Sequence, residues 1–292
     1  MMQPYTPLRY PGGKAKMGAF LAAVMKTNGL IESVYAEPYA GGAGAALHLL
    51  IRGYAKRLLL NDIDRAVVAF WRAVLNHGER FARKIERVPL TVAEWDRQKK
   101  IYGSETRGFE LGFACFYLNR TNRSGIMKGG IIGGREQDGP WLIDARFNRR
   151  ALADRVLAIG RLRRHISVTS DDALAFLDGF AAERFPKSFC YLDPPYFAKG
   201  KKLYTNYYKP KDHADIAARV KRLKQPWLLT YDDCKDIRDL YKSSRVLESE
   251  LSYSAREVRR GREIVVLAPG LKLPAEMPQR PHSANNPGFE LV

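Results

Sequence analysis

Short apolar runs separated by longer amphipathic stretches predict strands and helices that alternate along the chain, the pattern of an α/β fold. Several of the runs end in glycine, proline, Asn or Asp, as strands do where they meet loops. Seven runs are predicted to be strands of one sheet: residues 34–36, 58–60, 166–169, 189–192, 227–231, 245–251 and 263–268.

The strand pattern is interrupted between residues 66 and 164. Helical periodicity appears four times in this stretch, and a long glycine-rich loop follows from Asn119 to Asp144. The four predicted helices are residues 67–75, 81–88, 93–102 and 109–118. The sheet resumes after them, so a helical segment is inserted between two parts of the sheet.

The charge of the chain narrows the choice of partners. Its 292 residues include 49 Lys and Arg against 31 Asp and Glu, a net charge of +18. Such a positive field suits a polyanion, most often nucleic acid, although ribosomal and membrane-surface proteins have the same excess of positive charge.

Apolar runs stay shorter than the roughly 18 residues that span a bilayer, and the start lacks a signal-peptide layout, so a cytoplasmic protein without membrane contact is expected. The three cysteines are far apart and no Cys or His pair has metal-ligand spacing, so neither disulfides nor a metal site is expected.

The segment Asp193-Pro194-Pro195-Tyr196 follows the apolar run 189–192, so a carboxylate, two prolines and an aromatic ring emerge where a buried strand ends. Because proline has no N–H, the turn leaves a backbone carbonyl to accept a hydrogen bond beside the Asp193 carboxylate. Two acceptors match the two donors of a planar amine, and Tyr196 can stack on the attached ring. This chemistry indicates an exocyclic amine of a nucleobase; the alternative is a plain strand-to-loop turn.

A glycine turn, Glu37-Pro38-Tyr39-Ala40-Gly41-Gly42-Ala43-Gly44, joins a predicted strand to a helix. Glycines of this kind let the backbone approach a nucleotide closely. About twenty residues later Asp62 ends the next strand, where nucleotide-binding folds place an acid on ribose hydroxyls. A dehydrogenase would show the same features, as would a tight turn with solvated acids.

Two further acids, Asp171 and Asp172, end the strand at residues 166–169. Ligands bind at the carboxyl edge of open α/β sheets, so Asp171 is a candidate partner for an adenine amino group. Asp172 is assigned to capping the helix that follows it.

The segment from Asn119 to Ile126 combines Asn and Arg, whose side chains make bidentate contacts to base edges. Any single arginine there is equally explained by a phosphate contact or by a solvated surface charge. Together they favour a nucleic-acid clamp, whose candidate DNA contacts are Asn119, Arg120, Asn122, Arg123 and Ser124.

Four segments, in this order, resemble the Dam-like DNA adenine-N6 methyltransferases, which use S-adenosylmethionine: Leu8-Arg9-Tyr10-Pro11-Gly12-Gly13-Lys14 and residues 37–44, 61–64 and 193–196. Residues 119–126 are similar to the recognition insert of that family. The resemblance covers most of the chain and implies the Rossmann-like, seven-stranded, mostly parallel sheet of class I methyltransferases. Residues 1–65 and 165–292 would form this catalytic domain, and residues 66–164 a helical target-recognition domain for duplex DNA.

The resemblance also implies a role for each matching residue. Tyr10 and Lys14 would lie against the cofactor and the catalytic pocket, Asp62 would bind the ribose and Asp171 the adenine of the cofactor. The wall beside the methionine part would consist of Glu37, Pro38, Gly41, Gly42 and Gly44. The catalytic pocket for a flipped-out adenine would consist of Asp193, Pro194, Pro195 and Tyr196.

The chain departs from the family at Asp172, where an apolar or aromatic side chain is usual. Cytosine N4, an adenine of RNA and a glutamine amide of a protein also present a planar NH₂ group to such a pocket. Asp at the first position of the segment 193–196 favours adenine, and the basic insert favours nucleic acid. A non-catalytic DNA-binding regulator with the same fold is the alternative from another class.

Overall fold

A computed structural model describes residues 5–9, 15–197, 208–249 and 263–275. Seven strands form one sheet in the order β3-β2-β1-β4-β5-β7-β6. Their bounds are β1 Ser33–Glu37, β2 Ala55–Asn61, β3 Ile166–Thr169, β4 Ser188–Leu192, β5 Trp227–Asp232, β6 Arg245–Ser249 and β7 Glu263–Leu267. Neighbouring strands are parallel except that β7 runs antiparallel to both β5 and β6. The predicted seven-stranded, mostly parallel sheet is confirmed.

The strands are apolar because helices cover both faces of the sheet. Every residue of β1, β4 and β7 is buried, which is the pattern of strands that contact helices on both sides. The helices are α1 Ala15–Thr27, α2 Gly44–Ile51, α3 Arg65–Arg87, α4 Val92–Gly103, α5 Gly108–Thr121, α6 Arg149–Arg161, α7 Ala173–Ala182, α9 Pro210–Val220 and α10 Lys235–Leu240. Two short 3₁₀ helices are η1 Arg123–Gly125 and η2 Arg163–His165.

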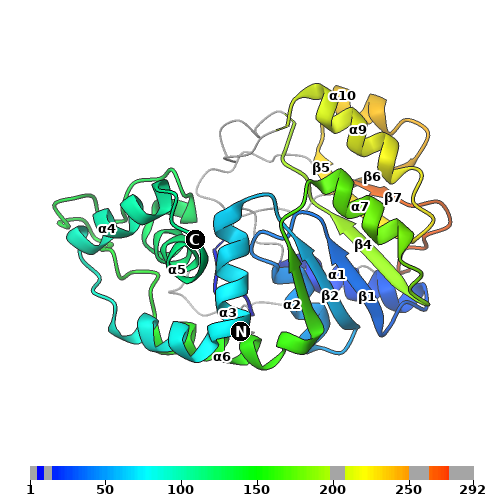
Figure 1. The fold of residues 1–292 in the computed structure, drawn as a ribbon. Helices are drawn as coiled ribbons and strands as arrows, with labels where there is room; N and C mark the ends of the chain where they lie inside the picture. The colour runs from blue at the N-terminus through cyan, green and yellow to red at the C-terminus, as the bar shows by residue number, and fades with distance from the viewer. Residues whose placement is uncertain (1–4, 10–14, 198–207, 250–262, 276–292) are drawn as a thin grey trace.

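Helix α3 connects the sheet to a helical part formed with α4, α5 and α6, and it runs between the two in Figure 1. The sequence predicts two separate helices here, residues 67–75 and 81–88, and α3 does consist of two helical parts that meet at a kink at His77 (φ −137°, ψ 36°). Before this point, Trp71 Nε1 donates to Gly41 O over 2.9 Å, next to the sheet. After it, the Phe81 ring packs against Phe113 at a centroid distance of 5.3 Å. The buried core is therefore continuous from the sheet into the helical part.

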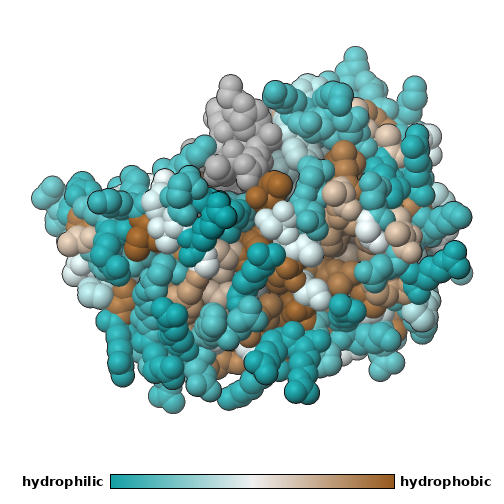
Figure 2. All heavy atoms as spheres, in the orientation of Figure 1, coloured by the Kyte–Doolittle hydropathy of each residue, from teal (hydrophilic) through white to brown (hydrophobic). Residues whose placement is uncertain are grey.

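Most of the visible surface of the helical part is polar in Figure 2, although Trp141 and Leu142 are exposed apolar side chains of this part. On the face shown in Figure 2, hydrophilic side chains project from these helices, and apolar side chains gather toward the middle of the molecule. None of the helices within the described ranges is both long and apolar enough to cross a membrane.

Candidate active site

A cleft of about 450 Å³ opens at the edge of the sheet where the parallel strands end. This is the edge at which α/β sheets bind ligands, and the parallel neighbours β1 and β4 lie at the point where the order of the strands in the sheet reverses. Loops after four strands and the start of α9 supply the lining residues: Pro38, Tyr39, Asn61, Ile63, Asp171, Asp172, Ala173, Pro195, Tyr208, Lys209 and Asp212.

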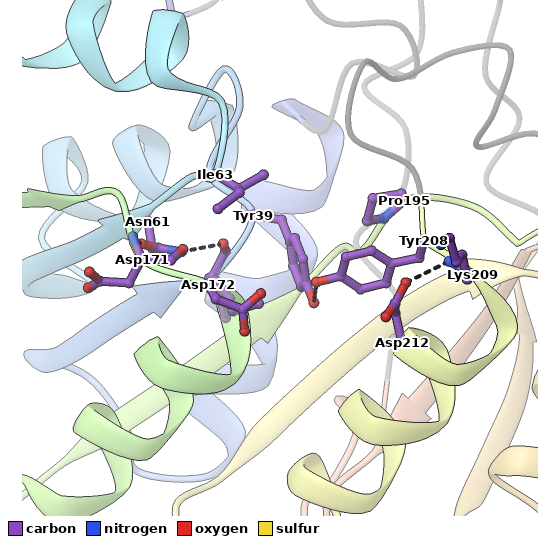
Figure 3. Close-up of a pocket in the computed structure, with 11 residues that line it drawn as sticks. Tyr39, Asn61, Ile63, Asp171, Asp172, Pro195, Tyr208, Lys209 and Asp212 are labelled. Atoms are coloured by element: carbon purple, nitrogen blue, oxygen red, sulfur yellow. Dashed lines mark hydrogen bonds between the residues drawn. The ribbon is translucent and has the colours of Figure 1, made fainter.

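Asn61 ties the loops at the base of the cleft together. Its side-chain amide donates to Pro38 O (3.1 Å) and to Asp171 O (3.0 Å), and its Oδ1 accepts from Thr169 Oγ1 and from Asp171 N, both at 2.8 Å. Figure 3 shows one of these contacts beside the cleft. The residue is 1% exposed, so the four hydrogen bonds replace those it would make with water. A polar residue at the end of an apolar strand is a sequence signal for such a role, and the sequence analysis did not use it.

Asp62 is joined to the glycine turn. Its Oδ2 accepts from Gly41 N over 2.8 Å, and its Oδ1 accepts from Asp64 N over 2.9 Å. Burial raises the pKa of this carboxyl to about 6, against the lowering effect of the two N–H donors. The turn reaches this position because Gly41 has a left-handed φ of 45°, which favours glycine.

The predicted cofactor residues fall into three groups. Pro38 and Asp171 line the cleft. Glu37, Gly41, Gly42, Gly44 and Asp62 lie in or beside the adjoining turn and are not among its lining residues. Tyr10 and Lys14 lie outside the described residues. Asp172 accepts from Leu174 N over 2.9 Å, so its predicted role as the cap of α7 is confirmed.

The segment Asp193-Pro194-Pro195-Tyr196 follows β4, and Pro195 faces the cleft. Side chains of β5 and β7 form hydrogen bonds with two residues of this segment. Asp193 Oδ1 accepts from Thr230 Oγ1 over 2.9 Å, and the Tyr196 hydroxyl donates to Glu263, a residue only 4% exposed.

Two features of the cleft were not predicted from the sequence. Ile63 is 51% exposed at the cleft, an apolar surface that a flat ring could cover. The Tyr39 and Tyr208 hydroxyls are 2.9 Å apart, and their rings stand next to each other in Figure 3. This contact joins the glycine turn to the start of α9, a link between distant parts of the chain that no local sequence pattern reports.

The structure corrects the prediction for three of the five DNA-contact residues. Asn119, Arg120 and Asn122 are 3%, 8% and 0% exposed, because their side chains bond neighbouring segments. Asn119 accepts from Arg9 N (2.6 Å) and donates to Arg9 O (2.7 Å). Arg120 Nε donates to Pro7 O (2.7 Å), and Asn122 Oδ1 accepts from Trp95 Nε1 (2.7 Å).

These three side chains attach the N-terminal segment and α4 to the end of α5, and little of their surface is exposed. Burial lowers the pKa of Arg120 to about 9, with Arg155 and Arg9 adding repulsion. Arg123 and Ser124 are exposed and remain available to a partner.

A metal site is not indicated within the described ranges, where no three His, Cys, Asp or Glu side chains are grouped to hold an ion. The Cys115 and Cys190 thiols are both buried.

Comparison with known families gives one match over most of the chain. The family described as "D12 class N6 adenine-specific DNA methyltransferase" matches residues 10–255. Comparison with curated proteins gave no significant match.

Solved structures that resemble this chain include two at low sequence identity. A Pyrococcus horikoshii protein described as an RNA methyltransferase is 11% identical, covers 91% of this chain and 89% of its own, and has a TM-score of 0.42. An rRNA methylase from Streptococcus thermophilus is also 11% identical, with 87% and 93% covered and a TM-score of 0.37. Similarity at this level carries no argument about substrate.

Proposed function

Because the chain belongs to the D12 class of N6 adenine-specific DNA methyltransferases, we propose that this methyltransferase transfers the methyl group of S-adenosylmethionine to N6 of an adenine in DNA. The observation that carries the proposal is the continuity of the cleft. It extends from Asp171, after β3, to Pro195 of the segment 193–196, so one cavity adjoins both the predicted cofactor residues and the predicted amine pocket.

The residues that line the cleft, and Asp62 beside it, fit this cofactor. Ile63 and Pro38 offer apolar surface to a purine ring, and the Asp171 carboxylate can accept from an adenine amino group. The Asp62 carboxylate holds two backbone N–H groups, yet two oxygens have about four lone-pair sites, so ribose hydroxyls can still donate to it. The acids around the cleft favour a cationic ligand. The bound cofactor would supply an activated methyl group on a sulfonium.

The segment 193–196 would hold the acceptor amine. Asp193 and the Pro194 carbonyl each accept one N–H, which keeps the nitrogen lone pair out of the purine ring and directs it at the methyl group. Tyr196 would stack on the base, with its hydroxyl fixed by Glu263. As the S–CH₃ bond breaks and S-adenosylhomocysteine leaves, positive charge develops on the amine next to the Asp193 carboxylate, and the N6 proton is then lost through Asp193 or to water. Positioning and electrostatics therefore account for the rate without a strong base.

DNA would reach the cleft across the helical part. An adenine within a duplex cannot enter such a pocket, so the enzyme would flip it out at a cost of a few kcal/mol. Contacts from the exposed Arg123 and its basic neighbours to phosphates would offset this cost. In this proposal residues 66–164 are the target-recognition domain, and residues 1–65 and 165–292 the catalytic one.

The test is transfer of labelled methyl from S-adenosylmethionine to unmethylated duplex DNA, single-stranded DNA and RNA, followed by nucleoside analysis. N6-methyladenine in DNA is the expected product. Label in RNA alone, or in N4-methylcytosine, would overturn the substrate but not the methyltransferase assignment. Absence of label in every nucleic acid would contradict the proposal.

A further inference from the structure

Strand β5 carries the small hydroxyl side chain of Thr230 within a run of larger buried side chains. Thr230 is 0% exposed, and the residues around it, Trp227, Leu228, Leu229 and Tyr231, are buried as well. A hydroxyl in such surroundings costs free energy unless it is hydrogen-bonded. The Thr230 hydroxyl is therefore expected to have hydrogen-bond partners inside the protein.

Two hydrogen-bond partners of Thr230 lie at the end of β4. The Thr230 Oγ1 atom is 2.9 Å from the Tyr191 hydroxyl and 2.9 Å from Asp193 Oδ1. The parallel register pairs Leu192 with Leu229, which places the next residues, Asp193 and Thr230, opposite each other at the edge of the sheet.

The direction of these hydrogen bonds follows from the proton count. A carboxylate only accepts, so the single Thr230 proton points at Asp193. Tyr191 must then donate to Thr230 Oγ1. Two hydroxyl dipoles are aligned toward the Asp193 carboxylate, and each strengthens the other in a buried environment.

We propose that Thr230 is a positioning residue for methyl transfer, which holds the Asp193 carboxylate in the orientation that accepts the substrate amine. This inference rests on the proposed function, because it assigns Asp193 to the amine. The terminal torsion of an Asp side chain is broad, so its backbone alone does not fix the plane of the carboxylate. Thr230 supplies a fixed donor because it sits on a central strand bonded to β4 and β7.

Strands β5 and β7 would therefore position different parts of the segment 193–196. Thr230 fixes the group that binds the amine, and Glu263 fixes the Tyr196 ring that would stack on the base. Both anchors are buried, so neither is expected to touch the substrate. Misplacing an acceptor by about 1 Å can cost on the order of 10²-fold in rate.

The test compares Thr230→Val, which keeps the shape and removes the hydroxyl, with Thr230→Ser, which keeps the hydroxyl. We expect kcat for methyl transfer to fall about 10- to 100-fold in Thr230→Val, while KM for S-adenosylmethionine changes less than about threefold. Thr230→Ser should recover most of the rate. Tyr191→Phe, which removes the second dipole, should give a smaller loss of the same kind.

Thermal unfolding of each variant separates positioning from packing. Wild-type kcat in a folded Thr230→Val protein would overturn the inference while the proposed function stands. Equal loss in the Val and Ser variants would also overturn it, because volume and not the hydroxyl would then matter. If the wild-type enzyme methylates neither DNA nor RNA, the proposed function fails and the inference fails with it.

Discussion

The Asp62 carboxyl gives the cofactor site a pH dependence at the scale of one residue. Its pKa is raised to about 6 by burial, so the group gains its charge as the pH rises through that value. Ribose hydroxyls donate more favourably to the ionised form. We expect the affinity for S-adenosylhomocysteine, measured by calorimetry, to increase from about pH 5 to about pH 7 and then to level off.

The matched control is Asp62→Asn, which should bind more weakly and lose this pH dependence. An affinity of the wild-type protein that is constant over the same range would contradict the assignment of Asp62 to the ribose. In the protein without ligand, a rise in pH through the pKa of Asp62 lowers stability, whereas it increases the affinity for the cofactor. The native carboxyl holds its proton more tightly than the unfolded chain does, so the free energy of unfolding falls as the pH rises from about 4 to about 6.

Residue type alone predicted the role of some side chains correctly and of others wrongly. Asp172 could be assigned as a cap because its partner, Leu174 N, is two positions away in the chain. Asn119 and Arg120 have side chains that read base edges, but they bond the backbone of Arg9 and Pro7, more than one hundred positions away. The same donors and acceptors serve both purposes, and only the fold decides which partner is within reach.

At the scale of elements, the contact between α3 and α5 depends on a glycine. A Cβ atom on Gly112 would lie 2.5 Å from Ala69 O, a backbone atom that cannot rotate away. We expect Gly112→Ala to separate the two helices and to lower the free energy of unfolding by about 1–3 kcal/mol, measured by urea denaturation.

Gly179 in α7 provides the control, because nothing lies within 4 Å of a Cβ atom placed there. Gly179→Ala should raise the free energy of unfolding by up to about 1 kcal/mol, since alanine is the better helix former. Similar effects of both substitutions would show that the close approach of α3 and α5 does not limit stability.

Helices and strands with strong periodicity could be predicted from the sequence, but the length of a break within a helix could not. Strands β1, β4 and β7 could be placed because burial on both faces makes each of them a largely apolar run, whereas β2, β3 and β6 are partly exposed and have shorter apolar runs. The sequence predicts the end of one helix and the start of another near His77, and α3 is kinked there between two helical parts, with non-helical backbone at His77 alone. The periodic pattern cannot distinguish a one-residue break from a loop, because the apolar stripe shifts in both cases.

The distribution of positive charge acts at the scale of the whole molecule. Arg120 and Arg123 are close in sequence, but one is 8% exposed and the other is on the surface. We expect Arg123→Gln to weaken binding to DNA and to reduce the slope of affinity against salt concentration by about 1, the value for one phosphate contact. Fluorescence anisotropy at several salt concentrations measures both quantities.

Arg120→Ala should behave differently. It removes hydrogen bonds to Pro7 O and Arg146 O, so it should lower the free energy of unfolding by about 1–3 kcal/mol and leave the salt dependence of the folded protein unchanged. A larger loss of DNA affinity in folded Arg120→Ala than in Arg123→Gln would contradict the assignment of Arg123 to DNA contact and of Arg120 to a structural role.

The edge of the sheet at which the site lies was within reach of sequence reasoning, but the shape of the cleft was not. Motifs after β1, β2, β3 and β4 point to one edge of a parallel sheet, because parallel strands end together. Tyr39 and Tyr208 meet through their hydroxyls across that edge, and this contact depends on how the start of α9 packs against the glycine turn. Such a contact between distant segments has no local signal in the chain.

The central claim is that one cleft binds the cofactor while Asp193 binds the acceptor amine. The most direct test measures both S-adenosylmethionine binding and methyl transfer to DNA in Asp193→Ala. The account predicts that transfer falls by at least about 10²-fold, whereas the dissociation constant of the cofactor changes only a few-fold. Equal loss of binding and transfer in a folded Asp193→Ala protein, or retained transfer, would contradict it.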